Sequence, residues 1–492
     1  MSVSVKLSWQ DQVSLSAADG GAVIAGPQAR VALRPLAPEL LAAMRRLEPP
    51  GEEEERLADS ILEEGTVDSL ARWFYHVDLF RRRGLVRRSL HAGERPLATL
   101  VPVIAGNERN SSGINPAARL GEERPSRKRS GPAGWFVLSR FAYLRREGAQ
   151  MVLESPLAQA RVVVDDPRAL AVLGALAMPA SIADLTEEVG ELPRDAIEGF
   201  LSLLDEAGML DRLGNDPPTS QTESAALEPW EFHDLLFHAK SRRGRSDGRF
   251  GGTFRFPHRP APPALKQPGE LEWYELLRPD MARLEREDAP FARVQNARRS
   301  IREFAAQPLA ARELGDFLFR VGRVTASWTS EVEGPGGSVT LDFAARPFPA
   351  AGALYELDFY VAVRACDGLA PGLYYYDGRN HRLGLVRETT DEVKLLLDEA
   401  AASTGIDPRS LQVLVILAAR FERMAWKYES IAYSLLLKDV GVVFQTMYLA
   451  ATAMSLAPCA VGCGDSELFA RAAGTNYYVE TSVGEFLLGS KK

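Results

Sequence analysis

The stretch MAWKYESIAYSLLLKDVGVVFQTMYLAATAMSL, residues 424–456, joins a polar beginning to the most apolar part of the chain. No residue between positions 440 and 464 is charged, and residues 431–456 are apolar nearly all round a helix. This pattern predicts a long helix that is buried in a core or in a subunit interface. Lys427 and Tyr428 stand just before it, so they are either its polar start or part of a reactive pocket.

Residues 440–464 are also long enough to be considered as a membrane span. They contain polar residues such as Gln445 and Thr452, and Pro458 with two glycines gives the second half the character of a turn. The sequence therefore favours a buried helix followed by a loop or strand, and no membrane association is expected.

The composition limits the class of protein. A chain of 492 residues is long enough for two to four domains, and 46% apolar with 25% charged residues is typical of soluble globular proteins. A net charge of −8 argues against a nucleic-acid partner, because nucleic-acid-binding domains are usually basic. We expect a cytoplasmic protein, since the N-terminus has no signal-peptide pattern and the three cysteines form no CxxC pair.

The first half of the chain contains two similar stretches, ARVALRPLAPELLAAMRRL at 29–47 and ARVVVDDPRALAVLGALAM at 160–178. Each follows a strand-like segment and leads through more helical pattern, in which Ser181 is an expected N-cap and Pro193 an expected first helical residue. This predicts two winged-helix-like modules. The expected recognition helix of the second, at 193–208, is acidic, which favours a peptide-binding or structural role over DNA binding.

The expected organisation has five parts. Winged-helix-like modules occupy 1–105 and 135–213, polar linkers occupy 106–134 and 214–270, and an α+β domain occupies 271–492.

Two stretches of the last domain predict buried strands. In ELDFYVAV, residues 356–363, Leu357, Phe359 and Val361 alternate and share one face. LQVLVILAAR, residues 411–420, is continuously apolar, as expected of a strand that is buried on both faces.

In NARRSIREF, residues 296–304, Arg298, Ser300 and Arg302 recur at every second position. Guanidinium groups fork onto phosphate oxygens and a hydroxyl adds a donor, so this stretch could hold a phosphorylated cofactor. Surface salt bridges are the alternative use of these side chains.

The stretch RPFPAAGALYELDFY, residues 346–360, places a turn of small residues at 349–352 before a strand. Such a turn lets backbone amides approach a flat ligand closely, although an ordinary loop is the alternative. The sequence has no HExxH, GxGxxG, P-loop or GxSxG pattern, and no metal site is expected. An enzyme of this kind would depend on a cofactor that brings its own chemistry.

Six motifs in this order resemble the nitroreductase-fold flavoenzymes, and more narrowly the SagB/ThcOx-type dehydrogenases that form thiazoles and oxazoles in peptides. They are RRSIREF, RPFPAAGALYELDFYVAV, GLAPGLYYYD, MAWKYESIAYSLLLKDVGVVFQTMYLAATAMSL, CAVGCGDSELF and ETSVGEFLLG. The resemblance covers about 271–492, and the N-terminal modules resemble the peptide-recognition winged helices fused to some members. It implies a nitroreductase-like FMN-binding fold and the FMN-dependent oxidation of azoline rings in a ribosomally made peptide to azoles.

The resemblance also implies site residues. Arg298, Ser300 and Arg302 would hold the phosphate and ribityl oxygens of FMN, and Lys427 and Tyr428 match the Lys-Tyr pair linked to azoline chemistry. The expected flavin contacts come from the small-residue turn, the long helix and the loop that follows it, namely Pro349, Ala350, Ala351, Gly352, Gln445, Gly462 and Gly464.

The chain departs from the family pattern at three positions. Ala350 replaces the usual Ser, which leaves a backbone contact but no hydroxyl contact. Ile431 and Ser434 replace two arginines that follow the Lys-Tyr pair, so the substrate or flavin contacts of those arginines are not expected here.

Azoline oxidation removes a hydride and a proton, and the proton needs an acceptor. Free Lys and Tyr side chains have pKa values of roughly 10 and are poor bases at neutral pH. A Lys at the edge of an apolar pocket is shifted toward its neutral form. We therefore hypothesise that Lys427 is the base and that Tyr428 is its partner or positions the substrate.

Two other functions stay open from the sequence. One is a nitro- or ene-reductase fed by NAD(P)H, for which the N-terminal modules would have no use. The other is a peptide-docking scaffold with a degenerate flavin fold, which the departures at Ala350, Ile431 and Ser434 would allow. The partners that the resemblance implies are an azoline-containing precursor peptide, the cyclodehydratase of the same pathway, and a second copy in a homodimer with FMN at its interface.

Overall fold

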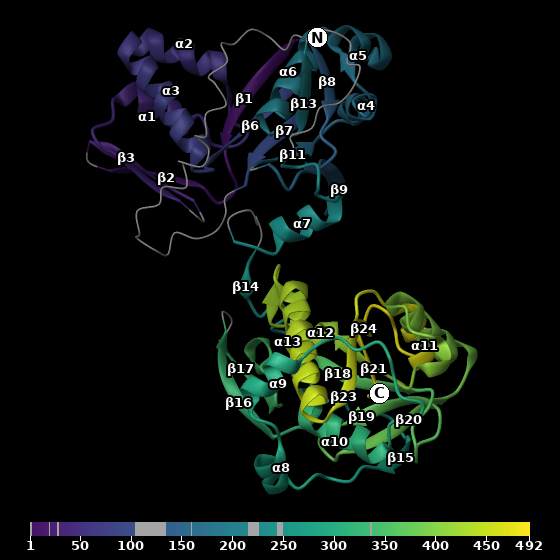
Figure 1. Ribbon diagram of the computed structural model, residues 1–492. Coiled ribbons are helices and arrows are strands. Elements are labelled where there is room, and N and C mark those ends of the chain that lie inside the picture. Colours follow the sequence, from purple (N-terminus) through teal and green to yellow (C-terminus); the bar gives the residue numbers. More distant parts are fainter. Residues whose placement is uncertain are drawn as a thin grey trace. The chain divides into compact units, whose positions relative to one another are not determined.

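The computed structural model describes residues 2–18, 20–26, 29–103, 134–158, 160–214, 226–243, 249–334 and 337–492. It has two compact units, Met1–Arg249 and Phe250–Lys492 (Figure 1). Almost all of the predicted linker at 106–134 lies outside the described residues.

The first unit combines antiparallel strands with seven helices within its described residues. Its elements are β1 (Val3–Trp9), β2 (Ser14–Ala18), β3 (Gly21–Ala25), β4 (Arg30–Leu33), α1 (Pro38–Arg45), β5 (Glu52–Glu53), α2 (Glu54–Glu64), α3 (Val67–Arg82), β6 (Val86–Ala92), β7 (Arg95–Pro102), β8 (Trp135–Leu138), β9 (Tyr143–Glu147), β10 (Gln150–Glu154), β11 (Ala160–Val164), α4 (Pro167–Ala175), β12 (Ala180–Ser181), α5 (Ile182–Val189), α6 (Arg194–Glu206), β13 (Leu210–Gly214) and α7 (Phe232–Lys240).

The two predicted repeats share one sheet. Its order is β5-β1-β6-β7-β11-β10-β9, and the junction is the pairing of β7 with β11, from Pro102↔Ala160 to Ala98↔Val164. Each repeat still has its own three helices, α1–α3 and α4–α6, which Figure 1 shows as separate groups, and each group has its own core.

The predicted helix signals of the second repeat are confirmed with one small shift. Ser181 caps α5, because its Oγ accepts a hydrogen bond from the N–H of Asp184 at 3.3 Å while the Asp184 carboxylate accepts from the N–H of Ser181 at 2.8 Å. Pro193 is the N-cap of α6 instead of its first helical residue.

The second unit is built around an antiparallel sheet of seven strands, in the order β15-β20-β19-β18-β21-β24-β23. Its elements are β14 (Gly251–Gly252), β15 (Glu272–Glu275), α8 (Met281–Glu287), α9 (Phe291–Ala297), α10 (Ala311–Gly322), β16 (Ala326–Gly334), β17 (Gly337–Ala345), η2 (Ala351–Ala353), β18 (Leu357–Val363), β19 (Gly372–Asp377), β20 (Arg382–Glu388), α11 (Asp391–Thr404), η3 (Pro408–Ser410), β21 (Val413–Arg420), α12 (Phe421–Ala425), β22 (Tyr428–Glu429), α13 (Ala432–Ala453), β23 (Leu456–Val461), α14 (Ser466–Ala473) and β24 (Glu480–Ser490).

The sheet separates two apolar cores, which confirms the expected central strands. Leu357 and Phe359 of β18 belong to the core that includes residues of α10 and α13, whereas Tyr360 and Ala362 belong to the core that includes residues of α11 and α14. Every residue of β18 is buried, and so are all residues of β21 except the last.

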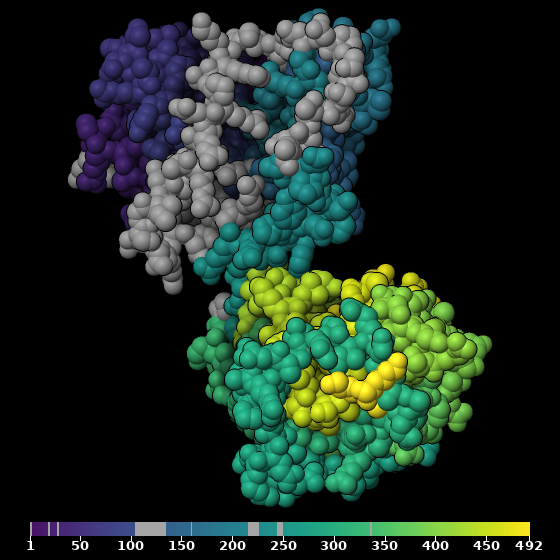
Figure 2. Space-filling model, viewed as in Figure 1, coloured from purple at the N-terminus to yellow at the C-terminus, as the bar shows by residue number. Residues whose placement is uncertain are grey.

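The long helix α13 was expected to be buried in a core or in a subunit interface, and in the single chain one of its sides is buried. Leu436, Val440, Val443 and Met447 are buried against the sheet, but the opposite side is exposed, with Leu437 at 40%. Figure 2 shows its yellow-green side chains at the surface of the second unit. Within the described part of the chain, α13 is the one helix whose length and composition would allow it to cross a membrane, a test that core helices also pass.

The stretch expected to link the modules to the last domain is partly structured. It contains α7, and from Phe250 onward it belongs to the second unit. Residues 250–270 carry no periodic apolar pattern in the sequence. They are held instead by the pairing of β14 with β22 and by hydrogen bonds that their carbonyl oxygens accept from Arg420, Arg423 and Trp426.

Candidate functional site

Lys427 and Tyr428 lie between two helices and meet the small-residue turn. Lys427 is in the turn after α12, and Tyr428 begins β22. A Cβ added to Gly352 would stand 2.5 Å from Tyr428 Oη and 2.9 Å from Lys427 Nζ. Gly352 also has a φ of +59°, so both its conformation and its surroundings require glycine. Two motifs that are separated by about 75 residues therefore form one site.

Strained backbone is concentrated around this contact. Seven non-glycine residues of the described chain have a positive φ, and four of them lie on the loops that meet at Lys427 and Tyr428. These four are Phe254 (51°), Ala353 (55°), Tyr355 (49°) and Ser430 (65°). Such conformations cost about 1–3 kcal/mol each and are found preferentially at functional sites.

Two acidic side chains are buried behind the turn. Asp439 of α13 accepts a hydrogen bond from the N–H of Ala351 at 2.9 Å and so fixes the turn to the helix. Glu356 is fully buried, and among the described residues neither of its carboxylate oxygens has a hydrogen-bond partner. Burial, followed by the negative charge of Asp439, raises the pKa of Glu356 to about 8, and burial also raises the pKa of Asp439. The pair thus holds a proton at neutral pH, and a protonated Glu356 would have Asp439 as its acceptor.

The surroundings of Lys427 and Tyr428 shift the pKa values of the two side chains in opposite directions. Burial lowers the pKa of Lys427, and the charge of Arg423 lowers it further. Burial raises the pKa of Tyr428, and the negative charges of Asp439 and Glu356 act in the same direction. Lys427 is therefore shifted toward a neutral amine, which can accept a proton, while Tyr428 stays a hydroxyl that can donate a hydrogen bond.

The predicted phosphate-binding residues form a second cluster. They follow α9 in a segment without helix or strand, in which Arg298 and Ser300 are half-buried and Arg299 is exposed. Ser300 Oγ lies 2.8 Å from Tyr448 Oη, which also accepts a hydrogen bond from the N–H of Ala460 at 2.8 Å. The guanidinium of Arg298 lies 5.2 Å from the centre of the Tyr448 ring. The second residue of the predicted arginine pair, Arg302, is exposed.

Helix α13 connects the two clusters. Asp439 contacts the turn and Tyr448 contacts Ser300, nine residues later, which corresponds to roughly 14 Å along a helix. Gln445 lies on the same side of the helix as Tyr448, one turn before it, and is exposed. A glycine turn at one end and guanidinium and hydroxyl groups at the other form a donor set that fits an elongated cofactor with a flat ring and a phosphate, as in FMN.

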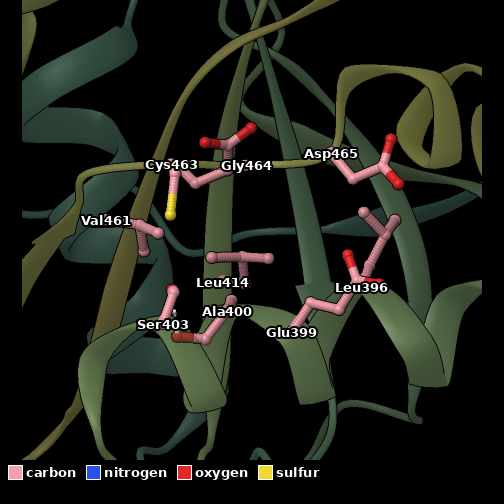
Figure 3. A pocket seen from close by; sticks show the side chains of 10 residues that line it. Leu396, Glu399, Ala400, Ser403, Leu414, Val461, Cys463, Gly464 and Asp465 are labelled. Carbon is pink, nitrogen blue, oxygen red and sulfur yellow. Dashed lines mark hydrogen bonds between the residues drawn. The ribbon is translucent and has the colours of Figure 1, made fainter.

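The two glycines after β23 have different surroundings. A Cβ on Gly462 would meet no atom within 4 Å, whereas a Cβ on Gly464 would overlap the carboxylate of Glu485. Cys463, Gly464 and Asp465 line a pocket of about 240 Å³ whose other wall is α11 (Figure 3). Packing therefore already explains Gly464, and neither Lys427 nor Gly352 lines this pocket.

Four residues that complete the site were not singled out from the sequence: Glu356, Asp439, Tyr448 and Phe254. The first two could have been noticed as acidic residues inside otherwise apolar stretches, since buried carboxylates are unusual. Tyr448 and Phe254 carry no such signal, because aromatic residues in apolar stretches are usually core residues.

Comparison with known proteins identifies the family of the second unit. Residues 296–488 match the model of the nitroreductase family. A protein of Methanocaldococcus jannaschii described as a nitroreductase, MJ1384, is 32% identical over 191 residues, which are 38% of this chain and 83% of that protein. The chain therefore belongs to the nitroreductase family and has the fold of its flavoprotein oxidoreductases.

The N-terminal unit shows which type of nitroreductase-family protein this chain is. Residues 1–109 match the ThcOx helix-turn-helix domain, and residues 136–247 match the model named cyanobactin oxidase ThcOx. The chain is thus a ThcOx-type member of the family, with a helix-turn-helix domain before its nitroreductase domain.

Two further relatives match more weakly. The trifolitoxin-processing protein TfxB of Rhizobium leguminosarum bv. trifolii is 27% identical over 113 residues, covering 23% of this chain and 30% of that protein. A solved nitroreductase structure from Ralstonia eutropha is 21% identical, covers 48% of this chain and 98% of that one, and has a TM-score of 0.35.

Proposed function

We propose that this chain is an FMN-dependent dehydrogenase that oxidises thiazoline or oxazoline rings in a ribosomally made peptide to azoles. The observation that supports the proposal is the close approach of Lys427 and Tyr428 to Gly352. Lys427 would then act as a proton acceptor beside the turn expected to hold the flavin. The ThcOx-type N-terminal unit and the similarity to a trifolitoxin-processing protein support a peptide substrate.

The chain's residues divide the work between binding and proton transfer. Arg298, Ser300 and Arg302 would bind the phosphate end of FMN. The flavin ring would lie against residues 349–352 and the glycine-containing loop after β23. Ala350 can offer only its backbone, and Gln445 would contact the cofactor from α13. FMN, when bound, supplies the acceptor for the hydride that leaves the azoline ring.

The remaining hydrogen of the azoline leaves as a proton. The electron pair of the C–H bond that is broken becomes part of the new double bond in the ring. The neutral amine of Lys427 takes the proton and becomes an ammonium group. Tyr428, as a hydroxyl, positions the ring by donating a hydrogen bond. Glu356 and Asp439, whose charges act on Tyr428, would share one proton and so avoid holding two negative charges behind the turn.

A visible spectrum of the purified protein tests the proposal. We expect a yellow protein whose flavin absorbance bleaches when an azoline-containing peptide is added without oxygen. Bleaching by NAD(P)H and not by the peptide would favour a nitro- or ene-reductase. A protein that remains colourless after incubation with FMN would favour the docking scaffold.

We also propose a cytoplasmic homodimer that works with the cyclodehydratase making the azoline. An apolar surface supports the dimer: Leu437 of α13 is 40% exposed, and Tyr477, Tyr478 and Val479 before β24 are at least 44% exposed. Tyr433 links these parts, since its ring lies 6.2 Å from Phe421, whose N–H bonds to the carbonyl of Val479. Sedimentation equilibrium of the parent and a Leu437→Glu variant would detect a dimer and its weakening.

A further inference from the structure

A short strand outside the matched regions lies against the Lys-Tyr pair. The ThcOx match ends at 247 and the nitroreductase match begins at 296, yet β14 lies between them. It pairs antiparallel with β22, with Gly251 opposite Glu429 and Gly252 opposite Tyr428. The N–H of Phe254 then donates to the carbonyl oxygen of Lys427 at 3.1 Å.

The ring of Phe254 covers the side of Lys427. Phe254 is 7% exposed, and its ring packs edge-on against Trp426 at 5.7 Å. The amine nitrogen of Lys427 lies 6.0 Å from the centre of the Phe254 ring. At this distance the attraction of an ammonium group to the ring is weak, so the main effect of Phe254 is to exclude water from the amine.

The backbone of Phe254 shows that its placement is imposed. Its φ of +51° is uncommon for a large side chain and costs about 1–3 kcal/mol. A residue in this state persists only where its surroundings determine its conformation. Here the ring contact with Trp426 and the hydrogen bond to Lys427 both do so.

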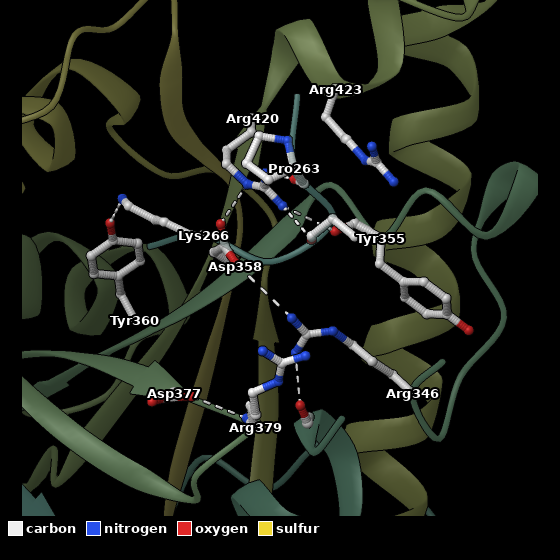
Figure 4. Close-up of polar contacts among 12 residues, drawn as sticks. Pro263, Lys266, Arg346, Tyr355, Asp358, Tyr360, Asp377, Arg379, Arg420 and Arg423 are labelled. Atoms are coloured by element: carbon white, nitrogen blue, oxygen red, sulfur yellow. Dashed lines mark hydrogen bonds and ion pairs between the residues drawn. The ribbon is translucent and has the colours of Figure 1, made fainter. Parts of the chain in front are cut away.

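The chain that follows Phe254 is fixed by residues just before Lys427 (Figure 4). Arg420 donates to the carbonyl oxygens of Pro263 at 2.7 Å and Ala264 at 2.8 Å, while its Nε bonds to Asp358 at 2.8 Å. The ring N–H of Trp426 donates to the carbonyl oxygen of Arg259 at 3.0 Å. The segment is therefore held on α12 and β21 with a defined register.

We infer that residues 251–254 are a positioning element of the active site, which holds Lys427 in place and keeps water from its amine. This inference rests on the proposed role of Lys427 as base. It assigns Phe254 to the site although the residue lies outside both matched regions.

The test is the titration of Lys427 in the full-length protein. Phe254→Gly removes the ring and retains a residue suited to the left-handed backbone, whereas Phe254→Leu keeps apolar bulk. Phe256 is unsuitable as a control, because it packs against the same cluster as Phe254 and Trp426. The control is Tyr274→Leu, because Tyr274 is an exposed aromatic residue of the edge strand β15. The titration is measured by acetylation of Lys427 with limiting acetic anhydride across pH, followed by mass spectrometry.

In Phe254→Gly we expect Lys427 to titrate about one pH unit higher than in the parent, because its amine gains water. The acid limb of kcat/KM for azoline oxidation should shift upward by the same amount, while FMN affinity stays within twofold. Phe254→Leu should shift the titration less, and the control Tyr274→Leu should not shift it. If Phe254→Gly fails to bind FMN, the titration of Lys427 in Phe254→Leu decides whether Phe254 affects the pKa of Lys427.

Unchanged titration of Lys427 in both Phe254 variants would overturn the inference, and so would an equal shift in the control. Failure of the proposed function gives a different result. If the parent oxidises no azoline but the Phe254 variants still shift the titration of Lys427, the positioning role stands and the substrate assignment is wrong.

Discussion

The two ends of α13 hold the candidate site in different ways. At the end near Tyr448, Ser300 and Arg298 lie on an extended segment and make ordinary polar and ring contacts. At the end near Asp439, glycine and strained loops hold Lys427, Tyr428 and two buried carboxyl groups together. A binding end needs donors of the right kind, whereas a reactive end must shift pKa values, which requires burial and costs stability.

Replacing Lys427 is the strongest test of this contrast. In Lys427→Ala we expect kcat/KM for azoline oxidation to fall by about 10²–10⁴-fold, the range typical of a lost general base, while FMN binding is kept. Lys427→Arg should be equally inactive, because a guanidinium group does not lose its proton. Stopped-flow bleaching of the flavin measures the rate, and Lys394→Ala, an exposed lysine of α11, is the control. A variant that reduces FMN at the parental rate would remove Lys427 from the reaction.

The binding end should respond in affinity and not in rate. Arg298→Ala should weaken FMN binding by about 10–100-fold, since a hydrogen bond to a charged group contributes ~1.5–3 kcal/mol. The rate at saturating FMN should stay within a few-fold of the parent. Arg299→Ala is a matched control, because Arg299 is the adjacent arginine, is exposed, and is not among the residues expected to bind the phosphate. Equal losses in both variants, measured by fluorescence titration with FMN, would show a general charge effect instead of a binding site.

The residues expected at the binding end come from one local pattern, whereas those that meet at the reactive end come from separate parts of the chain. Arg298, Ser300 and Arg302 form a local pattern, and local patterns can be read without the fold. The central strands β18 and β21 were predicted for the same reason, since strands that are buried on both faces are composed almost entirely of apolar residues. Phe254, Gly352, Tyr428 and Asp439 come from four separate segments of the chain. No local sequence pattern predicts that these segments meet.

The sequence left open whether α13 is buried in a core or in a subunit interface. Apolar residues on all faces of a helix indicate that it is buried, but they do not show whether the same chain or a second chain covers each face. One side packs on the sheet, and the other, which includes Leu437, is open in the single chain.

The buried acid pair predicts a pH effect on stability. The pKa of Glu356 is raised to about 8 in the folded protein, compared with about 4.3 in an unfolded chain. Folding therefore favours the protonated form, so this group's stability advantage is fully present below pH ~4.3 and is lost as the pH rises toward 8. Glu356→Gln carries no such titration.

We expect the Tm of the parent to fall between pH 5 and 8 by on the order of 5 °C more than that of Glu356→Gln, since 1 kcal/mol corresponds to ~2–4 °C in a domain of this size. Glu422→Gln, an exposed glutamate of α12, should behave as the parent. Calorimetric scans in matched buffers measure the difference. Parallel Tm profiles of the parent and Glu356→Gln would mean that Glu356 is ionised throughout, and the reactive end would then lack its shared proton.

The smallest expected effect lies at Ala350, which directly precedes the turn that contacts Lys427 and Tyr428. Its backbone is extended and its side chain half-buried, so a serine fits without strain. Ala350→Ser should strengthen FMN binding by about two- to tenfold, because one added neutral hydrogen bond contributes ~0.5–1.5 kcal/mol. The rate of azoline oxidation should not change, since Lys427 and Gly352 are untouched. Weaker FMN binding in this variant would show that the turn does not face the cofactor, and the flavin would then have to be held from the Tyr448 end alone.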